Sequence, residues 1–290
     1  MRNSQKILIA VMLLTTACNS DSSDEPQTVR PDQKEISLNP SIGQMTEGTR
    51  TTTYDSETIK TGGFTCAAYE ASTTTAFISP TTINWVTSQW QFSDGSHFWP
   101  TSGDLDFFAY KPATAPSYIT GPTYTTARSP QFTCDMNKNA DAEFIWALTT
   151  GQNKTNASSG VNLVFKHPFA LVTFQRSESS SFTINSVSIA ANFYQTGTCT
   201  FDGTTSTWTD TSGSVNPSIT FGVPILVIPG NYGSLAVSAE VTWTDWSTVT
   251  KTLSTSATFN LAAGNSYTYT INVTNAYGLV VTLSKYTEQW

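Results

Sequence analysis

Few side chains in this chain have the type and spacing for acid–base or metal chemistry. Asp104 and Asp106 lie two residues apart, so on a strand their carboxylates would share one face, as a calcium site or a glycosidase pair requires. No further carboxylates cluster near them in the sequence. We favour the alternative of a hairpin end, where the aspartates meet solvent after the Ser102–Gly103 turn.

The two histidines stand in settings typical of packed or capping residues. His97 precedes the aromatic segment 98–100, and His167 lies between Lys166 and Pro168 in an apolar stretch. No G-x-S-x-G, H-E-x-x-H, P-loop or G-x-G-x-x-G motif occurs. We therefore expect no enzyme, no cofactor and no metal site.

Three of the four cysteines, Cys66, Cys134 and Cys199, lie far apart and form no C-x-x-C pair. That spacing fits neither a zinc site nor a redox motif. A Cys66–Cys134 disulfide is one alternative outside the cytoplasm. The other, which we favour, is three buried thiols that pack as small hydrophobic side chains.

The fourth cysteine, Cys18, follows a secretory signal. Arg2 and Lys6 form a positive start, residues 7–14 are apolar, and residues 15–17 are small. The apolar run is too short to span a bilayer. A cysteine directly after small residues resembles a bacterial lipobox, although its Thr15 is not the usual aliphatic residue. We predict a signal peptide over residues 1–17 and a lipid anchor on Cys18, since two or more acyl chains hold a domain at a membrane stably. The alternative is a plain signal peptide.

The eight tryptophans are the remaining candidate binding residues. Trp85, Trp90 and Trp99 fall close together, as do Trp243 and Trp246. Exposed aromatic rings can stack against sugars, whereas in a leucine-poor β protein tryptophan more often fills the core. A coplanar exposed row would indicate a sugar-binding face, and buried rings would not.

The elements that position these residues are predicted to be strands. Residues 234–243 and 267–274 alternate apolar with polar side chains, which predicts half-buried strands. Residues 223–228 form a nearly continuous apolar run, which predicts a fully buried strand. No segment of about a dozen residues keeps a helical period. The chain is therefore predicted to be all-β, with antiparallel sheets stacked as sandwiches.

The length and charge of the chain limit its possible partners and its division into domains. The 290 residues carry a net charge of −7 and no basic run, which argues against nucleic acid as a partner. Residues 18–33 are rich in Ser, Asp and Pro and are predicted to form an acidic flexible tether. Residues 149–160 are polar and aperiodic, so we place a domain boundary there, between domains 34–156 and 157–290.

Several short segments occur in an order that resembles the fimbrillin-like family of Bacteroidetes. They are residues 47–54, 62–69, 98–100, 105–110, 165–174, 184–189, 225–229 and 263–270. With the lipobox, the resemblance covers nearly the whole chain. Residues 19–25 also resemble the acidic export tag of surface lipoproteins in that phylum.

The resemblance implies two transthyretin-like antiparallel β-sandwiches and a role as a type V pilus subunit. In that family a lipidated precursor reaches the outer membrane, a protease cuts after an arginine that follows the first strand, and the subunits polymerise by strand exchange. Here residues 34–38 would be that strand, and the cut would fall between Arg50 and Thr51. The surrounding loop is polar, as an exposed loop would be. The alternative is an uncut loop, as in anchor or tip subunits that escape cleavage.

The expected donor strand is residues 278–290. Leu279, Val281 and Leu283 alternate with Val280, Thr282 and Ser284, so one face could fill an apolar groove in another subunit. The alternative is that this segment is the last strand of its own sandwich.

Two hypotheses follow. The leading one is a stalk, anchor or tip subunit of a fimbria on the cell outer membrane, with other pilin subunits, the membrane and a host or bacterial surface glycan or protein as partners. The runner-up is a surface glycan-binding lipoprotein for polysaccharide capture.

Overall fold

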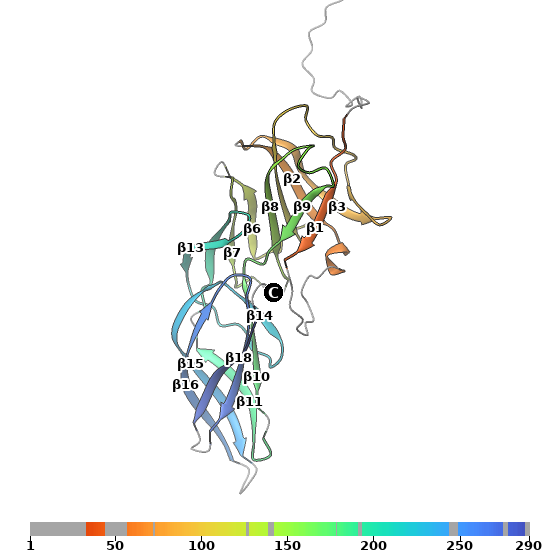
Figure 1. Cartoon of the computed structure of the whole chain (residues 1–290). Helices are drawn as coiled ribbons and strands as arrows, with labels where there is room; N and C mark the ends of the chain where they lie inside the picture. Colours follow the sequence, from red (N-terminus) through yellow and green to blue (C-terminus); the bar gives the residue numbers. More distant parts are fainter. Residues whose placement is uncertain are drawn as a thin grey trace, which may run out of the picture. The chain divides into compact units, whose positions relative to one another are not determined.

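A computed structural model describes residues 33–43, 57–71, 73–125, 128–138, 142–177, 179–190, 193–243, 249–274 and 278–287. All the strands described below belong to one unit, Lys34–Trp290 (Figure 1).

The described part of this unit contains eighteen strands and one short 3-10 helix, η1 (Thr58–Lys60). The first nine strands are β1 (Leu38–Ile42), β2 (Phe64–Glu70), β3 (Ala76–Val86), β4 (Gln89–Phe92), β5 (Leu105–Lys111), β6 (Ile119–Tyr124), β7 (Pro130–Asp135), β8 (Ile145–Gln152) and β9 (Val161–Phe165). The others are β10 (Ala170–Arg176), β11 (Phe182–Ala190), β12 (Thr196–Phe201), β13 (Ser206–Ser212), β14 (Pro224–Val227), β15 (Gly230–Trp243), β16 (Val249–Leu261), β17 (Ser266–Val273) and β18 (Leu279–Thr287). No described helix is long and apolar enough to cross a membrane.

A five-stranded sheet, in the order β4-β3-β2-β5-β8, is covered on both faces. Strand β5 shows this, because Phe107 packs into a core shared with β1 and β9, while Phe108 packs into a second core shared with β6, β7 and β12. These partners form a two-stranded sheet, β1-β9, and a four-stranded sheet, β13-β12-β7-β6. A strand buried on both faces needs apolar residues at successive positions, which explains the apolar run in β5.

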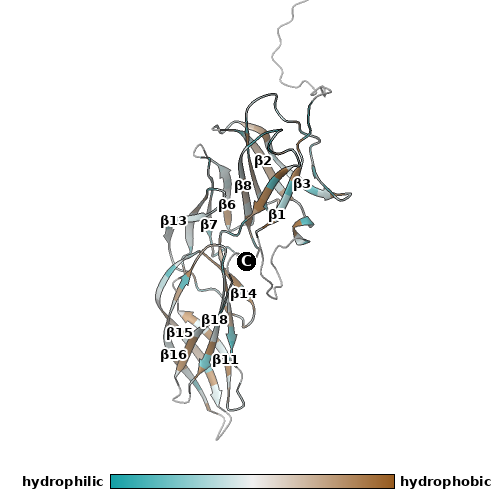
Figure 2. Ribbon diagram, in the orientation of Figure 1, coloured by the Kyte–Doolittle hydropathy of each residue, from teal (hydrophilic) through white to brown (hydrophobic). Residues whose placement is uncertain are grey.

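The remaining strands form a sandwich of two sheets, β14-β10-β17-β18 and β11-β15-β16, around a third core. The alternation predicted for β15 and β17 is confirmed: Leu235, Val237 and Tyr269 are buried, while their polar neighbours face outward. Hydrophobic and hydrophilic residues alternate along the strands of this sandwich (Figure 2).

The prediction of an all-β chain of stacked antiparallel sheets is confirmed, with three local differences. Two strand pairs, β1-β9 and β10-β17, are parallel. The first strand begins at Leu38, later than expected, although Glu35 forms an isolated bridge to Phe98. The prediction of full burial for residues 223–228 is wrong: Val223 is exposed and Pro224 half-buried, because β14 is an edge strand.

Two strands that follow residue 157 pair with strands that precede it. Strand β9 lies beside β1 (Figure 1), and β12 pairs with β7. The division into domains 34–156 and 157–290 stays a prediction.

Candidate functional site

The aspartate pair does not meet solvent together, so that expectation is wrong. Asp104 is exposed, whereas Asp106 is fully buried. Arg128 donates two hydrogen bonds of 2.6 Å to Asp106, and Tyr124 and the Gly151 backbone N–H each donate one of 2.7 Å. Burial alone would raise the pKa of Asp106, but these donors and the charge of Arg128 hold it below the usual range. Asp106 therefore acts as a structural anion that joins β5 to the ends of β6 and β8.

The histidines are packed, as expected. His97 bonds to Asp94 at 3.0 Å and packs against Phe92. His167 is buried, and its Nδ1 lies 2.5 Å from Oε1 of the buried Glu143. Neither arrangement includes a nucleophile beside a base.

The three cysteines in the described part, Cys66, Cys134 and Cys199, are all buried and unbridged, as we favoured. Burial raises the pKa of Cys134 to about 12 and moves the pKa of Cys66 further in the same direction, so neither is a reactive thiolate. No group of three or more His, Cys, Asp or Glu residues that could hold a metal ion occurs among the described residues.

The described tryptophans do not form a coplanar row. Trp99, Trp146 and Trp243 are buried. Trp85 is 37% exposed, but its ring meets that of Trp90 edge to face, with an interplanar angle of 62°. Trp246 and Trp290 lie outside the described residues.

The predicted assembly residues fall in two groups. Cys18, Arg50 and Thr51 lie outside the described residues. The three anchors of the expected donor strand lie on β18, which pairs antiparallel with β17 at the edge of its sheet. Within its own chain this segment is thus the last strand of a sandwich, which is what the alternative interpretation expected.

Burial of the expected donor face decreases along β18. Leu279 is 5% exposed, Val281 is half-buried, and Leu283 is 46% exposed. An irregularity opposite Thr268 and Tyr269 then shifts the register by one residue. As a result Tyr286, rather than residue 285, packs against the buried ring of Tyr267, at 5.2 Å between centroids.

Tyr286 was missed by sequence reasoning because strict alternation cannot continue through a bulge. The repeated Tyr-x-Tyr of β17 is the signal that could have pointed to an aromatic partner opposite it.

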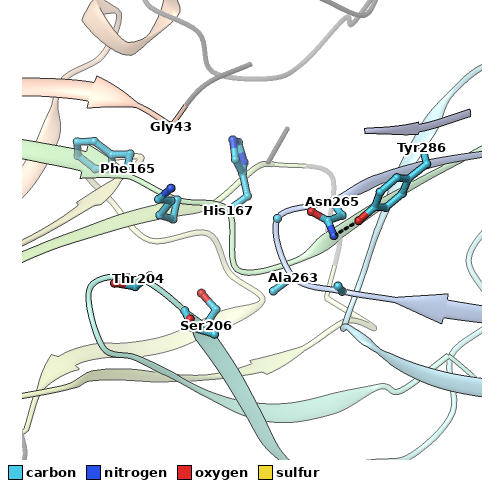
Figure 3. Close-up of a pocket in the computed structure, with 12 residues that line it drawn as sticks. Gly43, Phe165, His167, Thr204, Ser206, Ala263, Asn265 and Tyr286 are labelled. Atoms are coloured by element: carbon cyan, nitrogen blue, oxygen red, sulfur yellow. Dashed lines mark hydrogen bonds between the residues drawn. The ribbon is translucent and has the colours of Figure 1, made fainter. Parts of the chain in front are cut away.

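Residues near the ends of β1 and β18 line a common cavity of about 430 Å³, which we call the junction pocket. Its lining includes Gly43, which follows β1, and Tyr286, near the end of β18. It also includes Phe165, Lys166, His167, Thr204, Thr205, Ser206, Ala262, Ala263, Gly264 and Asn265. Figure 3 shows Asn265 and Tyr286 joined by a hydrogen bond, which the Asn265 amide donates at 2.9 Å.

Comparison with known proteins identifies the family. The profile of the fimbrillin-like family matches residues 44–290. No curated protein matches the chain. The fimbrial anchor protein Mfa2 from Porphyromonas gingivalis is similar in structure, with 10% identity, a TM-score of 0.35 and coverage of 88% of this chain and 100% of that one.

A candidate cell adhesion protein of Bacteroides thetaiotaomicron shows 15% identity, a TM-score of 0.41 and coverage of 84% and 96%. A candidate adhesin of Bacteroides ovatus shows 7% identity, a TM-score of 0.43 and coverage of 90% and 98%. The family assignment rests on the profile, which spans most of the sequence. The chain belongs to the fimbrillin-like family.

Proposed function

We propose that this protein is a subunit of a type V fimbria that is lipidated at Cys18, cut between Arg50 and Thr51, and polymerised by donor-strand exchange. The fimbrillin-like family is a structural one, and its members are fimbrial or adhesion-related subunits of the cell surface. The lipid, the cut and the exchange are our proposal.

The packing of β1 is the observation that best supports strand exchange. Strand β1 pairs with β9 in a sheet of two strands, and Ile36 and Leu38 are buried in the core beneath it. Burial of each such side chain contributes about 1.5–3 kcal/mol. Loss of this strand would leave an apolar groove along β9, lined by Val161, Leu163 and Phe165, and the unpaired edge of β9 would accept a new strand.

The position of the cut follows from chain order. The described residues that include β1 end at Gly43, and Arg50 lies between Gly43 and the next described residue, Glu57. A cut there leaves β1 attached to the main body by noncovalent contacts alone.

Strand β18 is suited to donation because the apolar side chains of its outer half are only partly buried. It lies at a sheet edge, and both Leu283 and Tyr286 are 46% exposed in their own chain. Moving these side chains into a closed groove would increase their burial, which favours the exchange.

The cleavage step is tested with trypsin on the full chain, with one variant that keeps a basic residue at position 50 and one that removes it. Wild type and Arg50→Lys should both give a new N-terminus at Thr51, and both should form ladders on unheated denaturing gels and fibres in electron micrographs. Arg50→Gln should remain uncut at this bond and monomeric. Polymers of Arg50→Gln equal to those of wild type, or cut wild type that stays monomeric, would contradict the proposal.

The anchor is tested separately by growth with labelled palmitate. Label should enter the wild-type protein and not the Cys18→Ala variant, because the Cys18 side chain is the proposed site of lipid attachment. Equal labelling of both proteins would refute the anchor and leave the cleavage experiment unaffected.

A further inference from the structure

Two adjoining surface hollows share one exposed carboxylate, that of Asp104. The first has a volume of about 420 Å³, and Glu70, Thr73, Phe77 and Ser102 are among its lining residues. The second has a volume of about 380 Å³, and its lining includes Asp104 and one cationic residue, Lys154, together with Ser102, Asn153, Thr155 and Asn156. Each volume lies within the range of small-molecule sites.

The polar groups of these hollows are held in place by their own loop. The Asn153 amide donates a 2.9 Å hydrogen bond to Oδ1 of Asp104. The Asn153 side-chain oxygen accepts from the backbone N–H groups of Thr155 and Asn156, at 3.0 and 3.1 Å. The Asn156 amide donates to the Gly151 carbonyl at 2.9 Å. The carboxylate is therefore oriented before any ligand arrives, which lowers the entropic cost of binding.

The first hollow also has an aromatic side chain in its lining. Phe77 is 36% exposed, and it lines the first hollow together with Asp104. An exposed phenylalanine costs free energy in water, and a ligand with an apolar C–H face would relieve that cost.

A carboxylate and carboxamide beside an exposed ring match the chemistry of an uncharged sugar. Its hydroxyl groups can donate to Asp104, and the C–H face of its ring can lie against Phe77. Two carboxylates, those of Glu70 and Asp104, line the first hollow, so an acidic sugar would meet like charge there.

We propose that the two hollows around Asp104 form one binding site for a neutral saccharide, with Asp104 as the hydrogen-bond acceptor and Phe77 as the stacking surface. The combined site extends over more than one sugar ring. It includes no residue of β1 or β18, so it is independent of strand exchange.

The site is tested on the full chain by saturation-transfer NMR and calorimetry with lactose, maltose and methyl α-mannoside as neutral probes and 3′-sialyllactose as the acidic probe. Asp104→Ala and Phe77→Ala should each weaken binding of the preferred neutral probe by about tenfold or more, because each removes one of the two recognition elements. Asp94→Ala, which also removes an exposed carboxylate bonded to one side chain, and Val86→Ala, which trims an exposed apolar residue of the same strand, are the controls and should change binding less than about twofold. All four variants should keep the wild-type melting temperature within a few degrees.

Three results would overturn the proposal. One is that no neutral probe binds wild type at 50 mM. Another is that the Asp104 and Phe77 variants bind as tightly as the controls, which would place any sugar site elsewhere. The third is that 3′-sialyllactose binds more tightly than lactose, which would refute the neutral class.

Discussion

Single residues show where sequence patterns stop being informative. Asp106 looked like a turn residue because its neighbours in sequence are Ser102, Gly103 and Asp104. Its role is set by Arg128 and Gly151, which lie 22 and 45 residues further along the chain. No local pattern records a partner at that distance. The histidines and cysteines were easier to interpret, because the sequence predicted only that they are packed. That prediction does not depend on knowing a distant partner.

Replacement of Asp106 should destabilise the protein much more than replacement of Asp104. Asp106→Asn leaves the Arg128 guanidinium without its carboxylate and removes the charge from a fully buried acceptor, and we expect a loss of about 2–4 kcal/mol in the free energy of unfolding. Asp104 is exposed, and an asparagine at this position keeps an acceptor for Asn153. The Asp104→Asn variant should therefore lose less than about 0.5 kcal/mol in the free energy of unfolding. Urea denaturation near pH 7 measures both. Equal losses would contradict the structural role of Asp106.

The same carboxylate predicts the direction of a pH effect. The pKa of Asp106 is lower in the folded protein than in the unfolded chain, so its ionisation contributes stability fully above the ordinary aspartate pKa of about 3.9. That contribution is lost as the pH falls through this value toward the lowered pKa. The stability difference between wild type and Asp106→Asn should therefore be largest near pH 6–7 and shrink below about pH 4. A difference that stays constant down to about pH 3 would contradict the assignment.

At the scale of elements, alternation predicted the strands that have one apolar face and no interruption. Strands β15 and β17 lie inside their sheets, so each apolar position meets a core. Strand β14 was misjudged because an apolar run does not reveal whether the strand lies at an edge. In β18 strict alternation would put residue 285 next on the face of Leu279, Val281 and Leu283, but the bulge puts Tyr286 there. Edge position and bulges depend on neighbouring strands, which single-strand periodicity does not contain.

The burial gradient along β18 predicts unequal effects of the same substitution. Leu279→Ala removes a side chain that is 5% exposed and should cost about 2–4 kcal/mol of stability. Leu283→Ala removes one that is 46% exposed and should cost less than about 1 kcal/mol. Chemical denaturation of the two variants measures the difference. If Leu283→Ala were as costly as Leu279→Ala, the outer half of β18 would be firmly held in its own chain, and the case for donation would weaken.

At the scale of the whole molecule, the sequence predicted the fold class but not the connections between sheets. Strand β9 pairs with β1 across more than a hundred residues, and β12 pairs with β7 across the expected boundary. Parallel pairing of distant segments leaves no local signal, because each strand would alternate in the same way beside any partner. The pairing matters for the proposed strand exchange, since β9 is the strand that the loss of β1 would expose.

The β1–β9 pair offers a way to test the release of β1 separately from the cut at Arg50. Asn39 and Asn162 are matched in register on these two strands, and both are exposed. Neighbouring strands lie about 4.8 Å apart, which falls within the Cα separation of about 4.4–6.8 Å that a disulfide spans. The double variant Asn39→Cys and Asn162→Cys, made in a Cys18→Ser background, should therefore lock β1 in place when oxidised.

The locked protein should still be cut by trypsin at Arg50 but should remain monomeric, because β1 continues to fill its groove. Addition of a reductant should release the strand and allow ladders to form within the same sample. Asn39→Cys alone loses the 2.8 Å hydrogen bond from Asn39 to the Ser159 carbonyl but forms no bridge, so it should polymerise with or without reductant. Polymerisation of the oxidised double variant at the wild-type rate would show that β1 need not leave, and that the subunits join through another surface.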